Sequence, residues 1–163
     1  MKNAVLKCLI ENARMDYSEI SERTGLTVDE DLIFYVHDEL EKNGVIKGYH
    51  AIIDDSVENG NTKVCAIIEV KVRPEREGGF DKVARRISKF PEVVSVNLVS
   101  GSFDLELEIQ GDNLHEVANF VASKLAPIDG VLSTNTCFLL KRYKIAGKIL
   151  DNKEEYERLK VTP

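Results

Sequence analysis

The side chains best placed to bind a small molecule occur in SGSFD at residues 100–104. Gly101 would let the chain turn tightly between two strands and leave backbone N–H groups exposed. Such groups could hold the carboxylate of an amino acid while Asp104 attracts its ammonium group. Alternatively, Gly101 serves only the turn, and Asp104 is a solvent-facing strand charge that alternates with Glu106 and Glu108. The candidate effector-binding residues in this turn are Ser100, Gly101, Phe103 and Asp104.

Two hydroxyl side chains, Thr134 and Thr136, are the second candidate for ligand binding. They are two residues apart in a predicted strand and therefore share one of its faces. They could line a polar pocket, or they could reflect the preference of threonine for strands. Both remain candidate effector-binding residues.

The sequence contains no pattern typical of catalysis or metal binding. His37, His50 and His115 lie in separate predicted elements, without a nucleophile or carboxylate at motif spacing. The three cysteines, Cys8, Cys65 and Cys137, are far apart and form no C-x-x-C pair. We therefore expect no enzyme activity, no metal site and no cofactor.

The first third of the chain predicts three short helices. Apolar residues at helical spacing predict a helix over 3–13 with Val5, Leu6, Leu9 and Ile10 inward. Ser18 is expected to cap a second helix, which Gly25 ends. Thr27, with Glu30 completing a capping box, is expected to begin a third that closes at Gly44. This order is typical of a helix-turn-helix, whose last helix would face DNA. Its candidate DNA-binding residues are Arg23, Thr27, Tyr35, His37, Lys42 and Lys47.

The charge of this segment works against such a function. The chain has a net charge of −6, and residues 1–54 carry six basic against eleven acidic side chains. No Lys or Arg occurs between Arg23 and Lys42, whereas six acids do. Because affinity for DNA comes largely from neutralising phosphates, an acidic face that only supports the fold is the alternative interpretation.

After the polar, turn-rich stretch DDSVENGNT the pattern changes to alternating strands and helices. Strands are predicted over 62–72, 93–100, 103–110 and 131–144, and helices over 79–90 and 114–125. This βαββαβ order predicts a ferredoxin-like domain. VVSVNLV and VLSTNTCFLL place apolar or small residues on both strand faces. A sheet with helices on one side would then need a second chain to cover the other, which predicts a homodimer.

Three stretches make the sequence resemble the Lrp/AsnC ("feast/famine") transcription regulators over roughly residues 1–148. They are LEKNGVIKGYHA at 40–51, GSFD at 101–104 and TNTCFLL at 134–140. The resemblance implies a winged-helix-like DNA-binding domain, then a domain for dimerisation and amino-acid sensing. It also implies assembly of dimers into tetramers or octamers, with effectors near the interfaces between dimers. Unlike many family members, this chain has no Lys or Arg between the Gly25-Leu26 turn and the Leu40-Glu41 pair.

The expected organisation is therefore α+β. Residues 1–54 form the helix-turn-helix domain, 55–62 a linker, 63–145 the ferredoxin-like domain and 146–163 a C-terminal tail. No apolar run reaches the ~20 residues of a membrane span, and the N-terminus lacks signal-peptide features, so a cytoplasmic protein is expected. The expected partners are double-stranded DNA, an amino-acid effector and further copies of the chain. The alternative function is a metabolite-sensing oligomer whose helical domain no longer binds DNA and mediates protein contacts.

Overall fold

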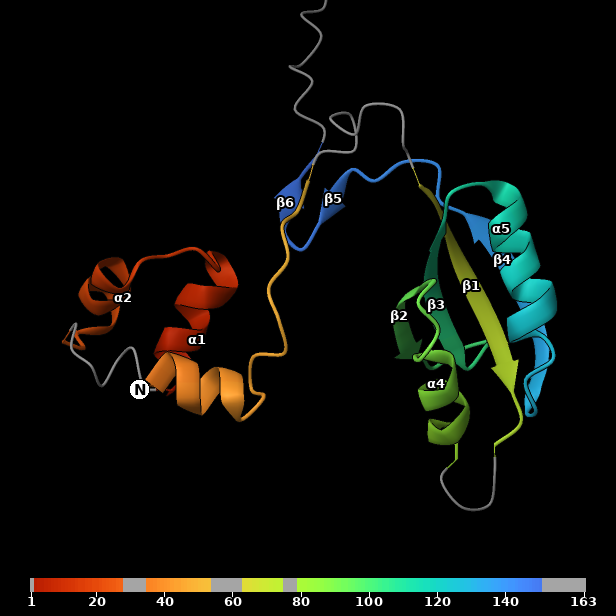
Figure 1. Ribbon diagram of the computed structural model, residues 1–163, viewed down its shortest axis with the longest axis horizontal. Coiled ribbons are helices and arrows are strands. Elements are labelled where there is room, and N and C mark those ends of the chain that lie inside the picture. The colour runs from red at the N-terminus through yellow and green to blue at the C-terminus, as the bar shows by residue number, and fades with distance from the viewer. Residues whose placement is uncertain (1, 28–34, 54–62, 75–78, 151–163) are drawn as a thin grey trace, which may run out of the picture. The chain divides into compact units, whose positions relative to one another are not determined.

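A computed structural model of the chain describes residues 2–27, 35–53, 63–74 and 79–150. The chain divides into two compact units, Met1–Ile52 and Ile53–Pro163. The first is helical, and the second is built on a four-stranded sheet (Figure 1).

The first unit contains α1 (Lys2–Glu11), α2 (Tyr17–Thr24) and the π-helix η1 (Tyr35–Lys42). Apolar side chains from all three elements, and Met15 between α1 and α2, form its core: Val5, Cys8, Met15, Ile20, Val36 and Leu40 are buried. The prediction that Ile10 lies on the buried face is wrong, because 82% of it is exposed. Leu6 and Leu9 are partly buried against this core.

The predicted cap of α2 is also wrong. The capping residue is Asp16, whose carboxylate accepts a hydrogen bond from the backbone N–H of Glu19 at 2.8 Å. Ser18 lies inside the first turn and donates its hydroxyl proton to Asp16. A carboxylate at this place also interacts favourably with the helix dipole. The predicted C-terminal residues are confirmed: Gly25 and Gly44 follow α2 and η1 with φ of 71° and 66°. Of the predicted Thr27–Glu30 capping box, Glu30 lies outside the described residues.

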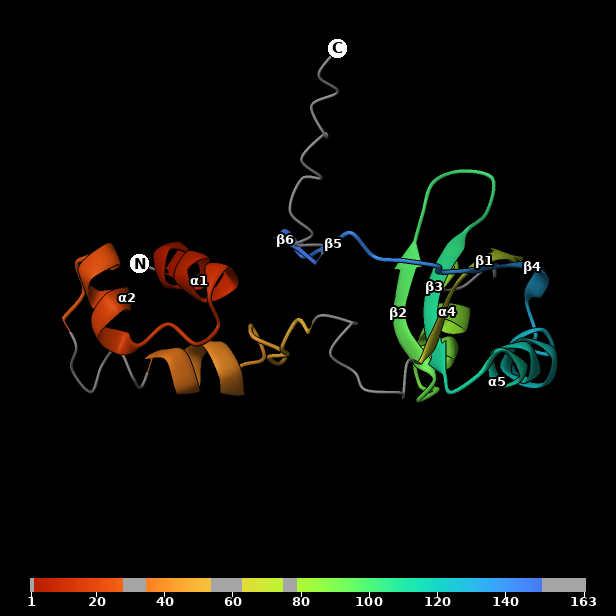
Figure 2. The ribbon, with the colours of Figure 1, turned by 90° about the horizontal axis from the view of Figure 1, so that it is seen from above.

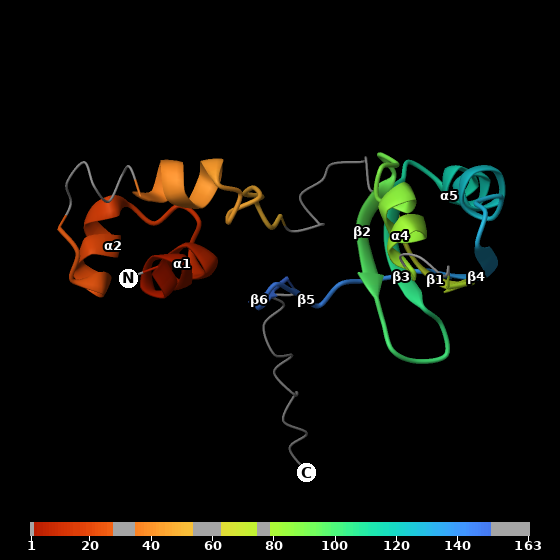
Figure 3. The same cartoon turned by 90° about the horizontal axis from the view of Figure 1, so that it is seen from below.

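The second unit has the predicted ferredoxin-like order. Its elements are β1 (Val64–Val72), α4 (Asp81–Ile87), β2 (Val93–Leu98), β3 (Leu105–Gly111), α5 (Leu114–Phe120), the π-helix η3 (Val121–Leu125) and β4 (Val131–Phe138). The strands are ordered β2-β3-β1-β4, and all neighbours are antiparallel. Figures 2 and 3 show α4 and α5 on the same side of this sheet.

The core of the second unit lies between those helices and the sheet. Alternate residues of the central strands β1 and β3 are buried, as expected for a sheet covered on one side. The helices supply Val83, Ile87, Val117, Phe120 and Leu125, as predicted. Phe90 and Phe120 pack edge to face with ring centroids 5.6 Å apart.

The last predicted strand, 131–144, is too long. The strand β4 ends at Phe138, and the N–H of Leu139 makes a further hydrogen bond to the carbonyl of Cys65. Because β1 begins at Val64, the apolar residues beyond this point have no strand to pair with. The chain instead forms a small hairpin of β5 (Lys144–Ile145) and β6 (Lys148–Ile149), so the boundary predicted at residue 145 falls inside a hairpin.

The face of the sheet away from the helices carries small residues, as predicted, but few large apolar ones. By strand register, the face away from the helices carries Ile67 as its only large apolar side chain among the paired residues. Its other members are Cys65, Glu69, Lys71, Ser95, Asn97, Glu106, Glu108, Gln110, Ser133, Asn135 and Cys137. A register shift between Val93 and Ser95 turns Val96 toward the core and leaves Val94 exposed. A bulge of this kind changes which residues share a face, and alternation in the sequence does not show it.

Among the described residues, no helix is both long and apolar enough to cross a membrane.

Candidate DNA-binding and effector-binding residues

The guanidinium group of Arg23 is paired within its own domain. It lies 2.9 Å from a carboxylate oxygen of Glu11 and 2.8 Å from one of Glu19. The charge of Glu11, followed by that of Glu19, outweighs burial and raises the pKa of Arg23. Arg23 must therefore leave two carboxylates before it can neutralise a phosphate.

The other predicted DNA-facing residues differ in how available they are. Lys42 forms an i,i+4 ion pair with Asp38, although most of its side chain is exposed. Thr27 and Lys47 are exposed, and Lys47 has no ion pair with any described residue. The hydroxyl of Tyr35 is buried and lacks a hydrogen-bond partner in the described structure, so it does not face outward. His37 lies in η1, and its side chain is outside the described part.

A second tyrosine, Tyr49, joins the segment after η1 to that helix. Its hydroxyl donates a hydrogen bond to the Glu41 carboxylate at 2.9 Å. Burial, then this hydrogen bond and the charge of Glu41, raise the pKa of Tyr49 to about 12.

Asp104, the predicted effector contact in the turn between β2 and β3, makes hydrogen bonds to the protein backbone. The Asp104 carboxylate accepts from the backbone N–H of Val72 at 2.8 Å, and its own N–H donates to the carbonyl of Val70. The pairing of β1 with β4 shifts register between Lys71 and Val72, at the place where Asp104 contacts β1. Asp104 therefore anchors the turn to the end of β1.

The backbone conformation of this turn does not require a glycine at position 101. Gly101 is exposed, its φ is not in the left-handed region, and a Cβ there would meet nothing within 4 Å. The connection spans residues 99–104, so it is longer than the tight turn predicted. Ser100 is exposed, whereas Phe103 is half-buried.

The structure does not bring the two groups of predicted effector residues together within one chain. Thr134 and Thr136 lie opposite Val70 and Ile68, which are buried under the helices. Asp104 alternates with Glu106 and therefore belongs to the other face of the sheet. Neither group lines either of the two cavities described next.

The larger cavity, of about 460 Å³, lies where β1 begins and the chain leaves β4. Its lining includes exposed apolar side chains of Leu114, Phe138 and Leu140, together with Lys63, Lys141 and Arg142. Arg142 is half-buried and paired with Glu108 on the open face of the sheet.

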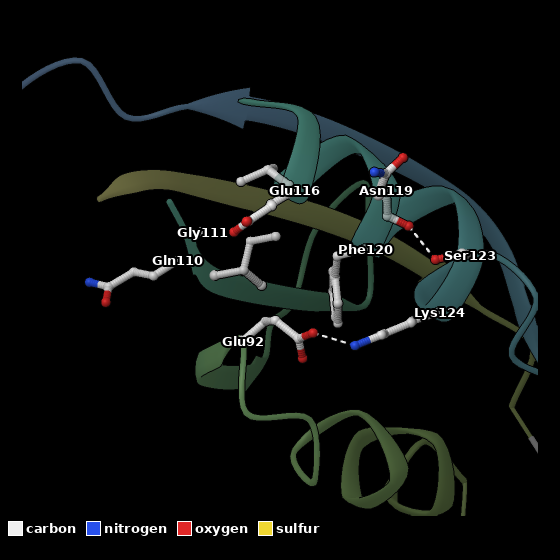
Figure 4. Close-up of a pocket in the computed structure, with 10 residues that line it drawn as sticks. Glu92, Gln110, Gly111, Glu116, Asn119, Phe120, Ser123 and Lys124 are labelled. Atoms are coloured by element: carbon white, nitrogen blue, oxygen red, sulfur yellow. Dashed lines mark hydrogen bonds and ion pairs between the residues drawn. The ribbon is translucent and has the colours of Figure 1, made fainter. Parts of the chain in front are cut away.

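The smaller cavity, of about 210 Å³, lies between the end of β3 and the helical segment α5–η3 (Figure 4). Glu92 and Lys124 form an ion pair at this cavity. They are 32 residues apart and belong to no local motif, so the sequence analysis had no signal that could have found them.

In the described ranges no three His, Cys, Asp or Glu side chains are grouped so as to hold a metal ion.

Comparisons with known proteins place this architecture among regulators. Residues 65–149 match the family model of the Lrp/AsnC ligand binding domain. Over 159 residues the chain is 43% identical to the uncharacterized HTH-type transcriptional regulator YugG of Bacillus subtilis, covering 98% of this chain and 95% of that protein. It is 26% identical to the regulatory protein AsnC of Haemophilus influenzae over 81% of this chain and 84% of that one.

Solved structures agree with these matches. A transcriptional regulator of Neisseria meningitidis in complex with L-Met superimposes with a TM-score of 0.64 at 29% identity, over 87% of this chain and 89% of that one. Escherichia coli AsnC, at 18% identity, shows the same fold with a TM-score of 0.61 over 87% and 91% of the two chains.

Proposed function

The chain belongs to the Lrp/AsnC family of HTH-type transcriptional regulators, and from this membership we propose that it binds specific DNA sites as a homo-oligomer and responds to a free amino acid. The observation that carries the proposal is the 43% identity to an HTH-type regulator across both units of the chain. Family membership also makes it a regulator rather than an enzyme. A regulator of this class works where the DNA is, so we expect it in the cytoplasm.

An amino acid is the proposed effector because the regulator from Neisseria meningitidis was solved with L-Met. Ser100, Gly101, Phe103 and Asp104 remain the proposed contacts in the turn, with Thr134 and Thr136 on the other face of the sheet. Because the two groups lie on opposite faces, one ligand could touch both only where two chains meet. Effector binding would then depend on assembly.

Exposed apolar side chains support the homo-oligomer and suggest where its contact lies. In the segment that leaves β4, Leu140 is 95% exposed, and Tyr143 and Ile149 are both 65% exposed. A hairpin whose strands are only two residues long, such as β5–β6, is marginally stable in water unless something packs on it. A second copy that packs on residues 138–149 would supply that cover. We propose a dimer that associates further into tetramers or octamers.

Binding of DNA by several weak domains at once would compensate for the acidity of η1. Two of the three basic candidate residues, Arg23 and Lys42, are already paired with acids, so each domain neutralises few phosphates. Paired domains on half-sites spaced by whole turns of about 10 base pairs would gain affinity through avidity.

The same ion pairs favour a second candidate function, a metabolite-sensing oligomer whose helical unit contacts protein instead of DNA. A salt titration of the full-length protein on the region upstream of its own gene separates the two. The first function predicts specific binding with a shallow dependence on salt, because the slope follows the number of phosphates neutralised. Absence of binding at low salt, with and without amino acids, would leave the second.

A further inference from the structure

The smaller cavity lies at the opposite end of β3 from the turn that contains Asp104. The residues that line it come from β3, α5, η3 and the position just before β2: Glu92, Ile109, Gln110, Gly111, Glu116, Val117, Asn119, Phe120, Ser123 and Lys124. Figure 4 shows Glu92 and Lys124 on one side of it and Glu116 on the other. It is therefore separate from the proposed effector contacts.

Its charged groups leave an excess of one negative charge. Glu116 has a local role: its carboxylate accepts from the N–H of Asp112 at 2.9 Å, while its own N–H donates to Asn113 at the start of α5. Glu92 is only half used, because one carboxylate oxygen accepts from Lys124 and the other is buried without a hydrogen-bond partner in the described structure. Each carboxylate oxygen can accept more than one hydrogen bond, so the oxygen that is paired with Lys124 can also accept from a second donor.

The unpaired oxygen has almost no accessible surface, so a ligand in the cavity would bind the oxygen that is paired with Lys124. The side chains of Glu92 and Lys124 are 28% and 45% exposed, and an ion pair this accessible to water is weakly held.

The remaining walls are apolar and closely packed. Ile109, Val117 and Phe120 are buried core residues, and Phe90 fixes the ring of Phe120. Gly111 lets α5 approach β3, since a Cβ there would lie 3.2 Å from the Cβ of Glu116. On the opposite rim the helix changes to π-helical hydrogen bonding, with the N–H of Ala126 donating to the carbonyl of Val121. Such segments occur frequently at functional sites.

We propose that this cavity binds a small organic monocation, a primary ammonium group on a short branched apolar body. The ammonium would donate to Glu92 and neutralise the excess charge, and the apolar body would contact Val117 and Phe120. An engineered cavity of about 150 Å³ holds benzene, so about 210 Å³ is enough for roughly six or seven non-hydrogen atoms. A free amino acid fits less well, because its carboxylate cancels the charge of its ammonium and the excess negative charge of the cavity would remain.

Calorimetry on the full-length protein at neutral pH tests this with three matched probes. Isoamylamine is the cation, isoamyl alcohol its neutral counterpart, and leucine the zwitterion with the same apolar body. The amine should bind, and the alcohol and leucine should bind at least about tenfold more weakly, the loss expected for one charge-assisted hydrogen bond. Glu92→Gln should weaken binding of the amine about tenfold.

Two further variants separate binding in the cavity from a general effect of charge. Ser123→Trp keeps the charge but fills the rim, and it too should weaken binding of the amine, which matters if Glu92→Gln folds poorly. Asp81→Asn makes the same change of charge at the exposed pair with Arg85 on α4 and should leave binding unchanged.

Equal binding of amine and alcohol, or amine binding that Ser123→Trp leaves intact, would overturn the proposal. Competition between leucine and the amine for the cavity would also overturn the proposal. Because the proposed effector site does not share these residues, Asp104→Ala should not affect binding of the amine.

Discussion

Asp104 could act in two ways, as a ligand contact and as an anchor for its turn. Its carboxylate already accepts the N–H of Val72 where the β1 ladder changes register. One oxygen is committed to this bond, and the ammonium of an effector would have to share the same carboxylate.

We predict that Asp104→Ala weakens or abolishes binding of the amino-acid effector while the fold and dimer persist. The N–H of Val72 loses its acceptor, so the free energy of unfolding should also fall by about 1–2 kcal/mol. Calorimetry with candidate amino acids and urea unfolding measure the two effects. Glu106→Gln removes a negative charge from the same face of β3 and is the control for effector binding, which it should leave unchanged. If an effector is found and Asp104→Ala binds it unchanged, the effector site is elsewhere.

Tyr49 gives a prediction about alkaline pH. Its pKa of about 12 in the folded protein exceeds the ordinary value of 10.0, so the folded state holds this proton more tightly. The resulting stability is fully present below pH 10 and is lost as the pH rises from about 10 to 12. Tyr49→Phe should therefore lose less stability than the natural protein over that window. Urea unfolding of both proteins between pH 8 and 12 measures this, and parallel curves would contradict it.

Among the elements, η1 is the one whose charges would limit the proposed binding of DNA. It presents Asp38, Glu39 and Glu41, and its one lysine is paired with the first of these. Repulsion between these acids and the phosphates should therefore limit the affinity for DNA more than any poor fit of η1 to the groove.

We predict that Asp38→Lys combined with Glu39→Lys raises non-specific affinity for DNA at low salt, by roughly tenfold or more. The change removes two repulsive charges, adds two cations and releases Lys42. Titration of a labelled DNA of unrelated sequence at several salt concentrations measures it. Asp81→Lys combined with Asp129→Lys makes the same change in net charge in the second unit and should have a much smaller effect. Equal gains in the two double variants would show that only net charge matters.

On the scale of the whole molecule, the exposed apolar side chains between Phe138 and Ile149 are the proposed contact between chains. The open face of the sheet is poorly suited to pack on its own copy, because Glu69 and Glu106 lie directly opposite each other on it. Like charges in this position are destabilising, and a second identical face would add two more.

We predict an assembly of two or more chains that persists at low micromolar concentration. Leu140→Asp combined with Tyr143→Asp should shift it toward the monomer, because charges would replace the apolar contact. Light scattering at several concentrations measures the mass, and Leu132→Asp, another exposed leucine of the same unit, is the control. A natural protein that scatters as a single 18.3 kDa chain would disprove the assembly.

The sequence alone determined the order of the elements and most of the core, since those depend on local periodicity. Residues such as Val83, Ile87, Val117 and Phe120 were predicted inward from helical spacing and are buried. The family was likewise readable from GSFD and TNTCFLL, and the acidity of the first unit from counting charges.

The tertiary structure decided everything that depends on which strand lies beside which. Where β4 ends follows from where β1 begins, and the shifts of register at Lys71–Val72 and at Val93–Ser95 set the faces of their residues. The separation of Asp104 from Thr134 and Thr136, and the meeting of Glu92 with Lys124, are consequences of that pairing. Contacts between residues tens of positions apart form only after the sheet has assembled, and local sequence patterns carry no record of them.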